Sequence, residues 1–369
     1  MYGTVTNRAL RVLGAPREYI QGPGAMQELP RLASRYGKGH LAAVIDGFLY
    51  DRLAPQLAAL FQARDQQVTC LRFAGEATLA EGARLTSAAA GADVVVGIGG
   101  GKAIDIGKYA GLHAGLPVFS MPTIASNDAP TSRLIVLYNE DHSVTGTEFL
   151  PANPDVVLVD TEIIAAAPPR LLRAGIGDAL TKFYEARAAQ ASAGMNSFSA
   201  RPPYLGRRLG EICLEVIHRL AAPVLADLER GQRHAGFEEL VETLILLSGL
   251  AFESGGLSVA HSMVRGLTRV PALSNWLHGE QVAYSTLVQI MLEGNAAELA
   301  HAIAFNRRLG LPAALRDMGV APDAVAGAAG VIGTYTMTAP YIGNFPRPLT
   351  AEAIRDAILA VEAQSQEQA

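Results

Sequence analysis

Cysteine and aromatic residues are scarce in this chain of 369 residues. Its only cysteines, Cys70 and Cys213, stand far apart, and neither belongs to a Cys-x-x-Cys pair. This usage disfavours a disulfide framework and a thiolate metal site, and it fits a reducing compartment. Aromatic residues make up 6% of the chain, whereas half of all residues are hydrophobic. Such a composition is typical of a globular enzyme built largely from aliphatic helices.

An excess of basic residues and a long apolar run are also missing. The formal net charge is -5, so we expect no basic face that would neutralise nucleic-acid phosphates or anionic lipid. The first residues lack the apolar core of a signal peptide, and no stretch approaches the roughly 20 apolar residues that a membrane helix needs. We therefore expect a cytoplasmic protein that binds neither nucleic acid nor membrane.

Two domains are expected from the length and from a change in pattern, since domains usually have roughly 100–200 residues. Residues 1–161 alternate short apolar runs with helical patterns, which predicts an α/β Rossmann-like domain with a parallel sheet. Residues 162–369 carry apolar residues at helical spacing, which predicts an all-α domain. We place the boundary just before the segment 165–169, whose paired prolines interrupt a helix.

Four apolar runs in the first domain read as strands of the sheet. They are LAAVID, DVVVGIGGGK, PVFSMPTIA and VVLVD, the first ending at Asp46 and the last at Asp160. Their continuous apolar character predicts burial on both faces of a parallel sheet. Residues 133–150 read as a hairpin with its turn at 139–142, and we expect this hairpin to lie outside the main sheet.

A glycine cluster follows the second of these strands and precedes a helical pattern. It comprises Gly97, Gly99, Gly100 and Gly101, followed by Lys102. Glycines let a backbone approach a ligand closely, and the N-terminus of a helix offers free N–H groups to phosphate. The pattern predicts a site for a dinucleotide pyrophosphate. The spacing is neither the Walker nor the GxGxxG type, and a tight strand-to-helix turn would look the same.

Asp46 is the candidate for the ribose of that dinucleotide. An acidic residue at the end of a strand accepts hydrogen bonds from ribose hydroxyls and repels a 2′-phosphate, so NAD is favoured over NADP. The alternative is that Asp46 only caps the following helix.

The segment MPTIASNDAPTS places many polar side chains after another predicted strand. The carboxyl ends of the strands of an α/β sheet are where ligands bind. We expect Asp128 to contact a substrate hydroxyl, although Asn, Asp and Pro in one segment also suit a turn. The polar side chains concerned are those of Thr123, Ser126, Asn127, Asp128, Thr131 and Ser132.

Asp178, His261 and His278 are the candidate metal ligands. Asp178 follows a Gly-x-Gly break and is expected to begin a helix, His261 lies within a helix after two glycines, and His278 begins a third helix. Three helices would thus each direct one ligand to a common point, and imidazole and carboxylate ligands with one open position are typical of catalytic zinc. Taken singly, they also suit a helix cap, a core histidine and a polar helix start.

Three charged residues near Asp178 are assigned no role. At helical spacing, Lys182, Glu185 and Arg187 are expected to form a solvated charged face. The six other histidines stand in no comparable context.

Five motifs together resemble the glycerol dehydrogenases of the iron-containing, or group III metal-dependent, alcohol dehydrogenase superfamily. In order and spacing they are GIGGGKAIDIGK, PTIASNDAPTS, VVLVDTEIIAAAPPRLLRAGIGDAL, GLSVAH and LHGEQVAYSTL. The resemblance runs from about Asp46 to about Val288. It implies a Rossmann-like NAD domain, a helical domain, and a metal-dependent active site in the cleft between them.

The resemblance also implies roles for individual residues. Asp178, His261 and His278 fall on the metal ligands of the family, which hold one divalent ion, zinc in preference to iron. Asp128 falls on the aspartate that contacts glycerol. The positions that match the NAD contacts of the family are Asp46, Gly100, Gly101, Lys102, Thr123, Ser126, Ser132, Leu134 and Tyr138.

Three departures concern the substrate pocket. Arg133 replaces a small residue in DAPTSRLIVLY, Trp276 lies where the family often has paired histidines, and Gly343 stands where a histidine is common. The metal and cofactor positions match, so the departures bear on which alcohol is bound.

The expected protein is a homo-oligomeric oxidoreductase that uses NAD and a metal to oxidise a small secondary alcohol or polyol reversibly, of the glycerol-to-dihydroxyacetone type. Three alternatives stay open at this point. The first is a related dehydrogenase that acts on a hydroxy acid or an amino alcohol. The second is a lyase similar to 3-dehydroquinate synthase, and the third is an NAD-binding protein without turnover.

Overall fold

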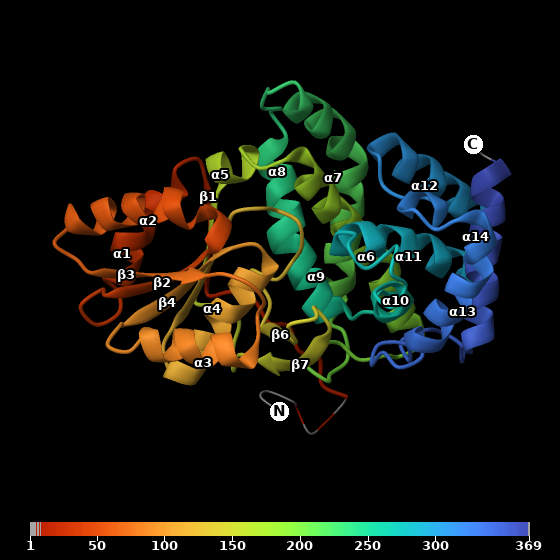
Figure 1. The fold of residues 1–369 in the computed structure, drawn as a ribbon. Helices are drawn as coiled ribbons and strands as arrows, with labels where there is room; N and C mark the ends of the chain where they lie inside the picture. Colours follow the sequence, from red (N-terminus) through yellow and green to blue (C-terminus); the bar gives the residue numbers. More distant parts are fainter. Residues whose placement is uncertain (1–4, 6, 8, 368–369) are drawn as a thin grey trace. The chain divides into compact units, whose positions relative to one another are not determined.

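The computed structural model describes residues 5, 7 and 9–367. It divides into two compact units, of which the first contains residues 14–168 (Figure 1). The second contains residues 169 onward together with the N-terminal segment up to Leu13, where the Leu10 carbonyl accepts a hydrogen bond from Arg201 N at 2.9 Å. The sequence patterns placed this segment in the first domain and the boundary between residues 161 and 162, which is seven residues before the boundary between these two units. The short helix α5 (Thr161–Ala165) packs on the sheet and so stays with the first unit.

The first unit is built on a six-stranded, all-parallel sheet, as the apolar runs predicted. The strand order is β1-β8-β5-β4-β2-β3. The four predicted strands are buried, whereas the two edge strands β1 and β3 are only partly buried and were missed. The strands are β1 (Glu18–Gly22), β2 (Leu41–Asp46), β3 (Val68–Phe73), β4 (Val94–Gly99), β5 (Val118–Pro122) and β8 (Val156–Asp160).

Helices cover both faces of this sheet (Figure 1). A 3-10 turn at Ala25–Glu28 and helices α1 (Leu29–Ala33) and α2 (Gly47–Gln62) pack on one face, where Phe61 and Phe119 belong to one apolar core. Helices α3 (Leu79–Ala88) and α4 (Gly101–Ala114) pack on the other, where Val95 and Ile106 belong to a second core.

The predicted hairpin is present and forms a separate two-stranded sheet. Strands β6 (Leu134–Tyr138) and β7 (Val144–Phe149) are antiparallel, with Leu134 opposite Phe149. The inward side chains of Ile135 and Leu137 join the second core, beside α4. The hairpin is thereby attached to the helix that follows the glycine cluster.

The second unit is helical, as predicted, and its described residues contain no strand beyond an isolated bridge between Arg11 and Arg201. One-turn 3-10 helices occur at Arg316–Met318 and Pro322–Ala324, and a π-helical turn at Thr243–Leu247 joins α8 to α9. The α-helices are α6 (Pro169–Ala191), α7 (Tyr204–Glu229), α8 (Phe237–Glu242), α9 (Ser248–Gly255), α10 (Val259–Leu267), α11 (His278–Glu293), α12 (Ala296–Leu309), α13 (Val325–Thr336) and α14 (Ala351–Glu367).

Close packing of α6 against α11 corrects the prediction that Asp178 begins a helix. Asp178 lies in the middle of α6, because the neighbouring glycines continue the helix instead of breaking it. A Cβ atom on Gly177 would lie 2.4 Å from the Gly279 carbonyl oxygen, and one on Gly279 would lie 1.8 Å from the Ala174 carbonyl oxygen. Glycine is needed here for the approach of two backbones.

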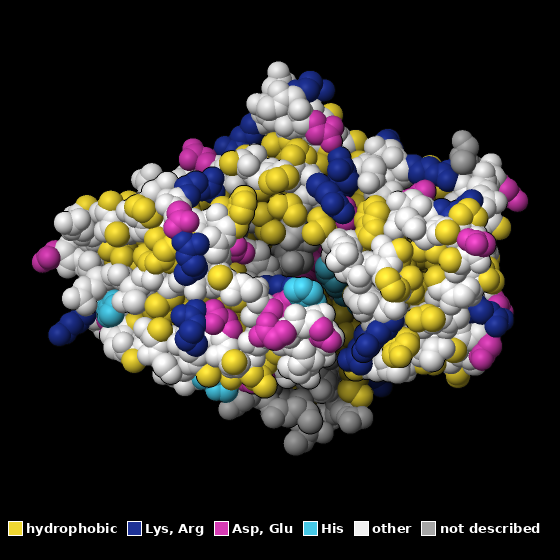
Figure 2. Space-filling model, in the orientation of Figure 1, with side chains coloured by type: hydrophobic (Ala, Val, Ile, Leu, Met, Phe, Trp, Pro, Cys, Tyr) yellow, Lys and Arg dark blue, Asp and Glu magenta, His cyan; other side chains and the backbone are white. Residues whose placement is uncertain are grey.

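Within the described residues, no single helix is long and apolar enough to cross a membrane. The helical segments Phe237–Gly255 and Val259–Leu267 are long and apolar enough only when taken together, and a bend of 100° separates them. On the face drawn in Figure 2, basic and acidic side chains are interspersed and form no single basic field.

Candidate metal centre and cofactor-binding site

The three predicted metal ligands lie together in the second unit. Asp178 on α6, His261 on α10 and His278 at the start of α11 each offer one ligand atom, and these atoms lie within 4.8 Å of one another. Nε2 of His261 is 3.2 Å, and Nε2 of His278 is 3.9 Å, from Oδ1 of Asp178. As the sequence predicted, each of three helices contributes one residue.

The donor set fits a divalent metal ion. Two imidazole nitrogens and one carboxylate oxygen are the usual ligands of catalytic zinc and leave a position for water or substrate. Within the described part of the chain, the buried Oδ2 atom of Asp178 has no hydrogen-bond partner. A buried carboxylate oxygen normally has one, so this atom is suited to a cation.

Glu185 holds His261 in place, a role that the sequence did not predict. Its Oε2 atom lies 2.6 Å from Nδ1 of His261, which leaves Nε2 to face Asp178. Its Oε1 atom accepts hydrogen bonds from the backbone N–H groups of Ser258 at 2.8 Å and His261 at 2.9 Å. A carboxylate on the second nitrogen of a metal-binding histidine fixes its tautomer and orientation.

Lys182 is the second unexpected member of this cluster. Its Nζ atom donates to Oδ1 of Asp178 at 2.7 Å and lies 3.3 Å from Nε2 of His261. The expected solvated face is therefore wrong for Lys182 and Glu185, whose side chains are fully buried. Arg187 instead pairs with Glu298 and Glu293. Their spacing could have indicated this burial, because residues four and seven positions after Asp178 lie on the same face of α6.

Opposite charges offset the cost of burying this cluster. Burial raises the pKa of Asp178, but Lys182, His261 and His278 together outweigh that effect and hold it well below its usual range. Burial lowers the pKa of His261, yet the carboxylates of Glu185 and Asp178 together reverse this and raise it to about 9. The pKa of Glu185 lies below its ordinary value, because His261 outweighs the effect of burial. Both carboxylates therefore stay ionised at neutral pH.

The candidate cofactor residues all lie in the first unit. At the glycine cluster, β4 passes directly into α4, whose N-cap Gly100 has no side chain to accept from the first N–H groups. A Cβ atom on Gly99, whose φ is +152°, would lie 2.7 Å from Cβ of Asp46. The backbone thus comes close to Asp46, and the uncapped helix N-terminus suits a phosphate.

Asp46 both caps a helix and lines a pocket, so its two interpretations are compatible. Its Oδ1 atom accepts from the backbone N–H of Phe48 at 3.0 Å at the start of α2. The pocket beside it has a volume of about 330 Å³. The sequence did not predict Phe48 and Arg72 there, and the Phe48 side chain is 94% exposed. The pocket is lined by Asp46, Gly47, Phe48, Arg72, Phe73, Ala74 and Gly75.

The polar segment after β5 is held by a buried lysine that the sequence did not identify. Nζ of Lys108 donates to the carbonyl oxygens of Ala129 at 2.6 Å and Leu134 at 2.8 Å, and it pairs with Asp105 at 3.0 Å. Thr123 N donates to the Gly99 carbonyl at 3.0 Å, which links the segment to the glycine cluster. Oδ1 of Asn127 accepts from Ala129 N at 3.1 Å, so the expected turn chemistry is present as well. Asp128 and Ser126 are partly buried, and Ser132 is buried.

Lys102 and Tyr138 are brought together although they are 36 residues apart. Lys102 is the second residue of α4, and its Nζ atom lies 4.8 Å from the ring centroid of Tyr138 at the end of β6. The same ammonium group donates to the buried carboxylate of Glu76 at 2.5 Å. No sequence pattern pointed to Glu76.

The three departures from the family pattern have different surroundings. The Arg133 side chain is 3% exposed and does not face solvent, and its guanidinium lies 5.8 Å from the Phe149 ring. Nε1 of Trp276 donates to the Met318 carbonyl at 3.0 Å. Gly343 is exposed, but its neighbour Asn344 accepts from Ser258 through its carbonyl at 2.8 Å. The altered C-terminal segment therefore borders the start of α10.

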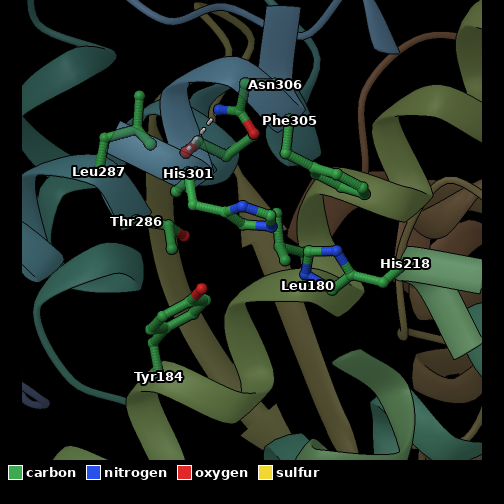
Figure 3. Close-up of a pocket in the computed structure, with 10 residues that line it drawn as sticks. Leu180, Tyr184, His218, Thr286, Leu287, His301, Phe305 and Asn306 are labelled. Atoms are coloured by element: carbon green, nitrogen blue, oxygen red, sulfur yellow. Dashed lines mark hydrogen bonds between the residues drawn. The ribbon is translucent and has the colours of Figure 1, made fainter. Parts of the chain in front are cut away.

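A second cavity, between α6, α7, α11 and α12, is too small for a substrate (Figure 3). Its volume is about 10 Å³, which is room for about one water molecule. The rings of His218 and His301 lie beside it, with centroids 5.4 Å apart. Burial lowers the pKa of His218. These two histidines do not belong to the group of candidate metal ligands, in line with the sequence analysis.

Comparison with known proteins decides the family. Residues 20–168 match the model of the family described as iron-containing alcohol dehydrogenase. The chain is 36% identical to glycolaldehyde reductase of Halobacterium salinarum, over 95% of this chain and 97% of that protein. It is 33% identical to glycerol dehydrogenase of Citrobacter freundii, over 96% and 97%. This chain belongs to the iron-containing alcohol dehydrogenase family.

A solved structure supports the same assignment. The fold is similar to the crystal structure of a probable glycerol dehydrogenase from Sinorhizobium meliloti 1021, with a TM-score of 0.90 and 36% identity. The match covers 97% of this chain and 99% of that one. The predicted α/β and helical halves, and the resemblance to glycerol dehydrogenases, are confirmed, and the chain is an oxidoreductase of the alcohol dehydrogenase type.

Proposed function

We propose that this iron-containing alcohol dehydrogenase family member uses NAD and one divalent metal ion to oxidise a small secondary alcohol or polyol reversibly. Glycerol to dihydroxyacetone is the type reaction. The observation that carries the proposal is the convergence of Asp178, His261 and His278, with ligand atoms within 4.8 Å of one another. Similarity to glycerol dehydrogenases supports the substrate class.

The second unit would supply the metal site. Asp178, His261 and His278 would hold the ion, with zinc proposed in preference to iron, and a bound ion of this kind lowers the pKa of a substrate hydroxyl. Glu185 keeps Nε2 of His261 directed at Asp178, so that the imidazole needs no reorientation to bind. The Asp178 carboxylate balances the charge of a cation at this buried position.

The first unit would supply the cofactor site, where the nicotinamide accepts the hydride. Gly100, Gly101 and Lys102 would bind the pyrophosphate at the N-terminus of α4. Asp46 would bind the adenosine ribose in its pocket and repel a 2′-phosphate, which favours NAD over NADP. Asp128 would orient a substrate hydroxyl. The other proposed cofactor contacts are Thr123, Ser126, Ser132, Leu134 and Tyr138.

The first test is removal of the metal from the purified protein. Dialysis against a chelator should abolish NADH formation, and added zinc should restore it better than ferrous iron under anaerobic conditions. A panel of glycerol, other diols, 2-hydroxy acids and amino alcohols identifies the substrate, and glycolaldehyde and dihydroxyacetone probe the reverse direction. Turnover that survives complete metal removal would overturn the metal-dependent mechanism.

Two further measurements complete the test of this function. Comparison of NAD with NADP under the same conditions tests the role of Asp46, since a preference for NADP contradicts it. Light scattering on the purified protein tests the homo-oligomeric state, which together with a cytoplasmic location forms part of the proposal.

A further inference from the structure

We propose that Glu76 is a positioning residue for the cofactor site, because it ties the start of α4 to the β6–β7 hairpin and so fixes Lys102 and Tyr138. This inference rests on the proposed NAD site. Glu76 is not one of the proposed cofactor contacts, so the inference adds a residue to that site.

Glu76 lies in the loop between β3 and α3, and its side chain is only 3% exposed. Its Oε1 atom accepts from the backbone N–H of Ala77 at 3.0 Å. Its Oε2 atom lies 2.5 Å from both Nζ of Lys102 and Nδ1 of His142. Since an ionised carboxylate only accepts hydrogen bonds, His142 must carry its proton on Nδ1 in this contact. Both carboxylate oxygens are thus engaged.

The two side-chain partners of Glu76 come from two separate parts of the first unit. Lys102 is on α4, directly after the glycine cluster, and His142 is in the turn of the hairpin. A backbone hydrogen bond supports the same link, because Tyr138 N donates to the Ala77 carbonyl at 3.0 Å. The loop therefore binds the hairpin at its turn and at the end of β6, while it also binds α4.

The hairpin turn is shaped to make this contact. His142 has a φ of +67°, a left-handed conformation that is uncommon for residues other than glycine. The turn is closed by hydrogen bonds from His142 N to the Asn139 carbonyl at 3.0 Å and from Asn139 N to the Ser143 carbonyl at 2.8 Å. Although the His142 side chain is 77% exposed, its ring reaches the buried carboxylate.

Charge explains why one buried carboxylate can hold both partners. Burial raises the pKa of Glu76, but the hydrogen bonds from His142 and Lys102 outweigh this and hold it below its ordinary value. The Lys102 side chain is 44% exposed, so its ammonium group lies between the buried carboxylate and solvent. A lysine has three N–H donors and can bind a phosphate without releasing Glu76. Its position over the Tyr138 ring adds a cation–π contact.

The test is the affinity of the full-length, metal-loaded protein for NAD, measured by calorimetry on wild type and on Glu76→Gln. The substitution keeps the shape of the side chain and removes the charge that holds Lys102. We expect the Kd and KM for NAD to rise about tenfold, while kcat at saturating NAD stays within about twofold. His142→Ala removes only the link to the hairpin and should raise Kd about threefold, with faster hydrogen exchange in segment 139–145.

Glu148→Gln is the matched control. Glu148 on β7 pairs with His113 in the last turn of α4 at 2.9 Å, so it is also a carboxylate–histidine pair between the hairpin and α4. It contacts neither Glu76 nor Lys102 and lies at the end of α4 away from the glycine cluster. It should leave Kd unchanged.

The outcomes separate this inference from the proposed function. A wild type that binds NAD, together with a Glu76→Gln variant of unchanged Kd and unchanged hydrogen exchange at the turn, overturns the role of Glu76 alone. If Glu76→Gln does not fold, an unchanged Kd in His142→Ala overturns the link to the hairpin. A wild type that does not bind NAD overturns the proposed cofactor and this inference with it.

Discussion

The proposed metal centre and the proposed cofactor-binding site are built in different ways. The metal centre depends on side chains: Asp178, His261 and His278 come from three helices, and Lys182 packs among them without exposure to solvent. The cofactor-binding site depends largely on backbone, since Gly99 and its neighbours form a strand-to-helix turn with an uncapped helix N-terminus. A single substitution should therefore damage the first site more than the second.

The largest effect is expected from Asp178→Asn. The amide removes the charge that balances a bound cation and the buried Lys182, so bound metal should be lost and kcat/KM should fall about 1,000-fold, equivalent to about 4 kcal/mol. Metal content by mass spectrometry and steady-state kinetics measure both effects. Asp227→Asn, near the end of α7 where it pairs with Arg230, is the control. Retention of stoichiometric metal would contradict the assignment of the ligand.

A smaller loss is expected when the support of His261 is removed. Glu185→Gln keeps a hydrogen-bonding group beside Nδ1 but removes the charge, and changes of this kind lower metal affinity about 10- to 100-fold. Competition with a chromophoric chelator measures that affinity without reference to turnover. The exposed Glu229, which pairs with Arg173, provides the control Glu229→Gln. Equal metal affinity in Glu185→Gln and wild type would show that Glu185 has a purely structural role.

In the proposed cofactor-binding site, adding a methyl group to a glycine of the strand-to-helix turn should have a moderate effect. A Cβ atom on Gly101 would lie 2.9 Å from Nδ2 of Asn127, a side chain that can shift. We therefore expect Gly101→Ala to raise the Kd for NAD about fivefold, or about 1 kcal/mol, and to leave metal content unchanged. Calorimetry and mass spectrometry on the same sample check both. Loss of metal in this variant would refute the contrast between the two sites.

The smallest expected effect is the pH dependence of the stability that Glu76 contributes to the folded protein. The pKa of Glu76 in the folded protein lies below its ordinary value, so its stabilising contribution is present above about pH 4.3 and is lost as pH falls through the folded-state pKa. The melting temperatures of wild type and Glu76→Gln should therefore converge as the pH is lowered below about 4.3. Scanning calorimetry between neutral and acidic pH tests this. A difference that widens on acidification would have the wrong sign.

Sequence patterns predicted the buried parts of the fold better than its edges. Strands β2, β4, β5 and β8 were recognisable because burial on both faces demands continuous apolar runs, whereas the edge strands β1 and β3 are partly exposed and have no such run. The start of a helix at Asp178 was wrong because glycine serves equally for a break and for close packing, and only the neighbouring helix distinguishes the two.

Some residues of the candidate site were predicted from the sequence and others were missed, again because the sequence does not show which distant residues are in contact. The candidate metal ligands have no local spacing that identifies them, so they were found only through the resemblance to a family. Lys182 and Glu185 were assigned to solvent because charged residues at helical spacing usually face it. Their burial becomes intelligible only when their partners, His261 and Asp178, are known to be adjacent. Glu76 was missed because its two partners are 26 and 66 residues away.

The contact between α6 and α11 has a consequence for how this enzyme tolerates change. Gly177 precedes one proposed metal ligand and Gly279 follows another, so the separation of Asp178 and His278 is set by two backbones in contact. A methyl group at either glycine would force the helices apart, and a misplacement of about 1 Å can cost about 100-fold in rate. Selection for turnover would thus act on two residues that have no side chain and touch no reactant.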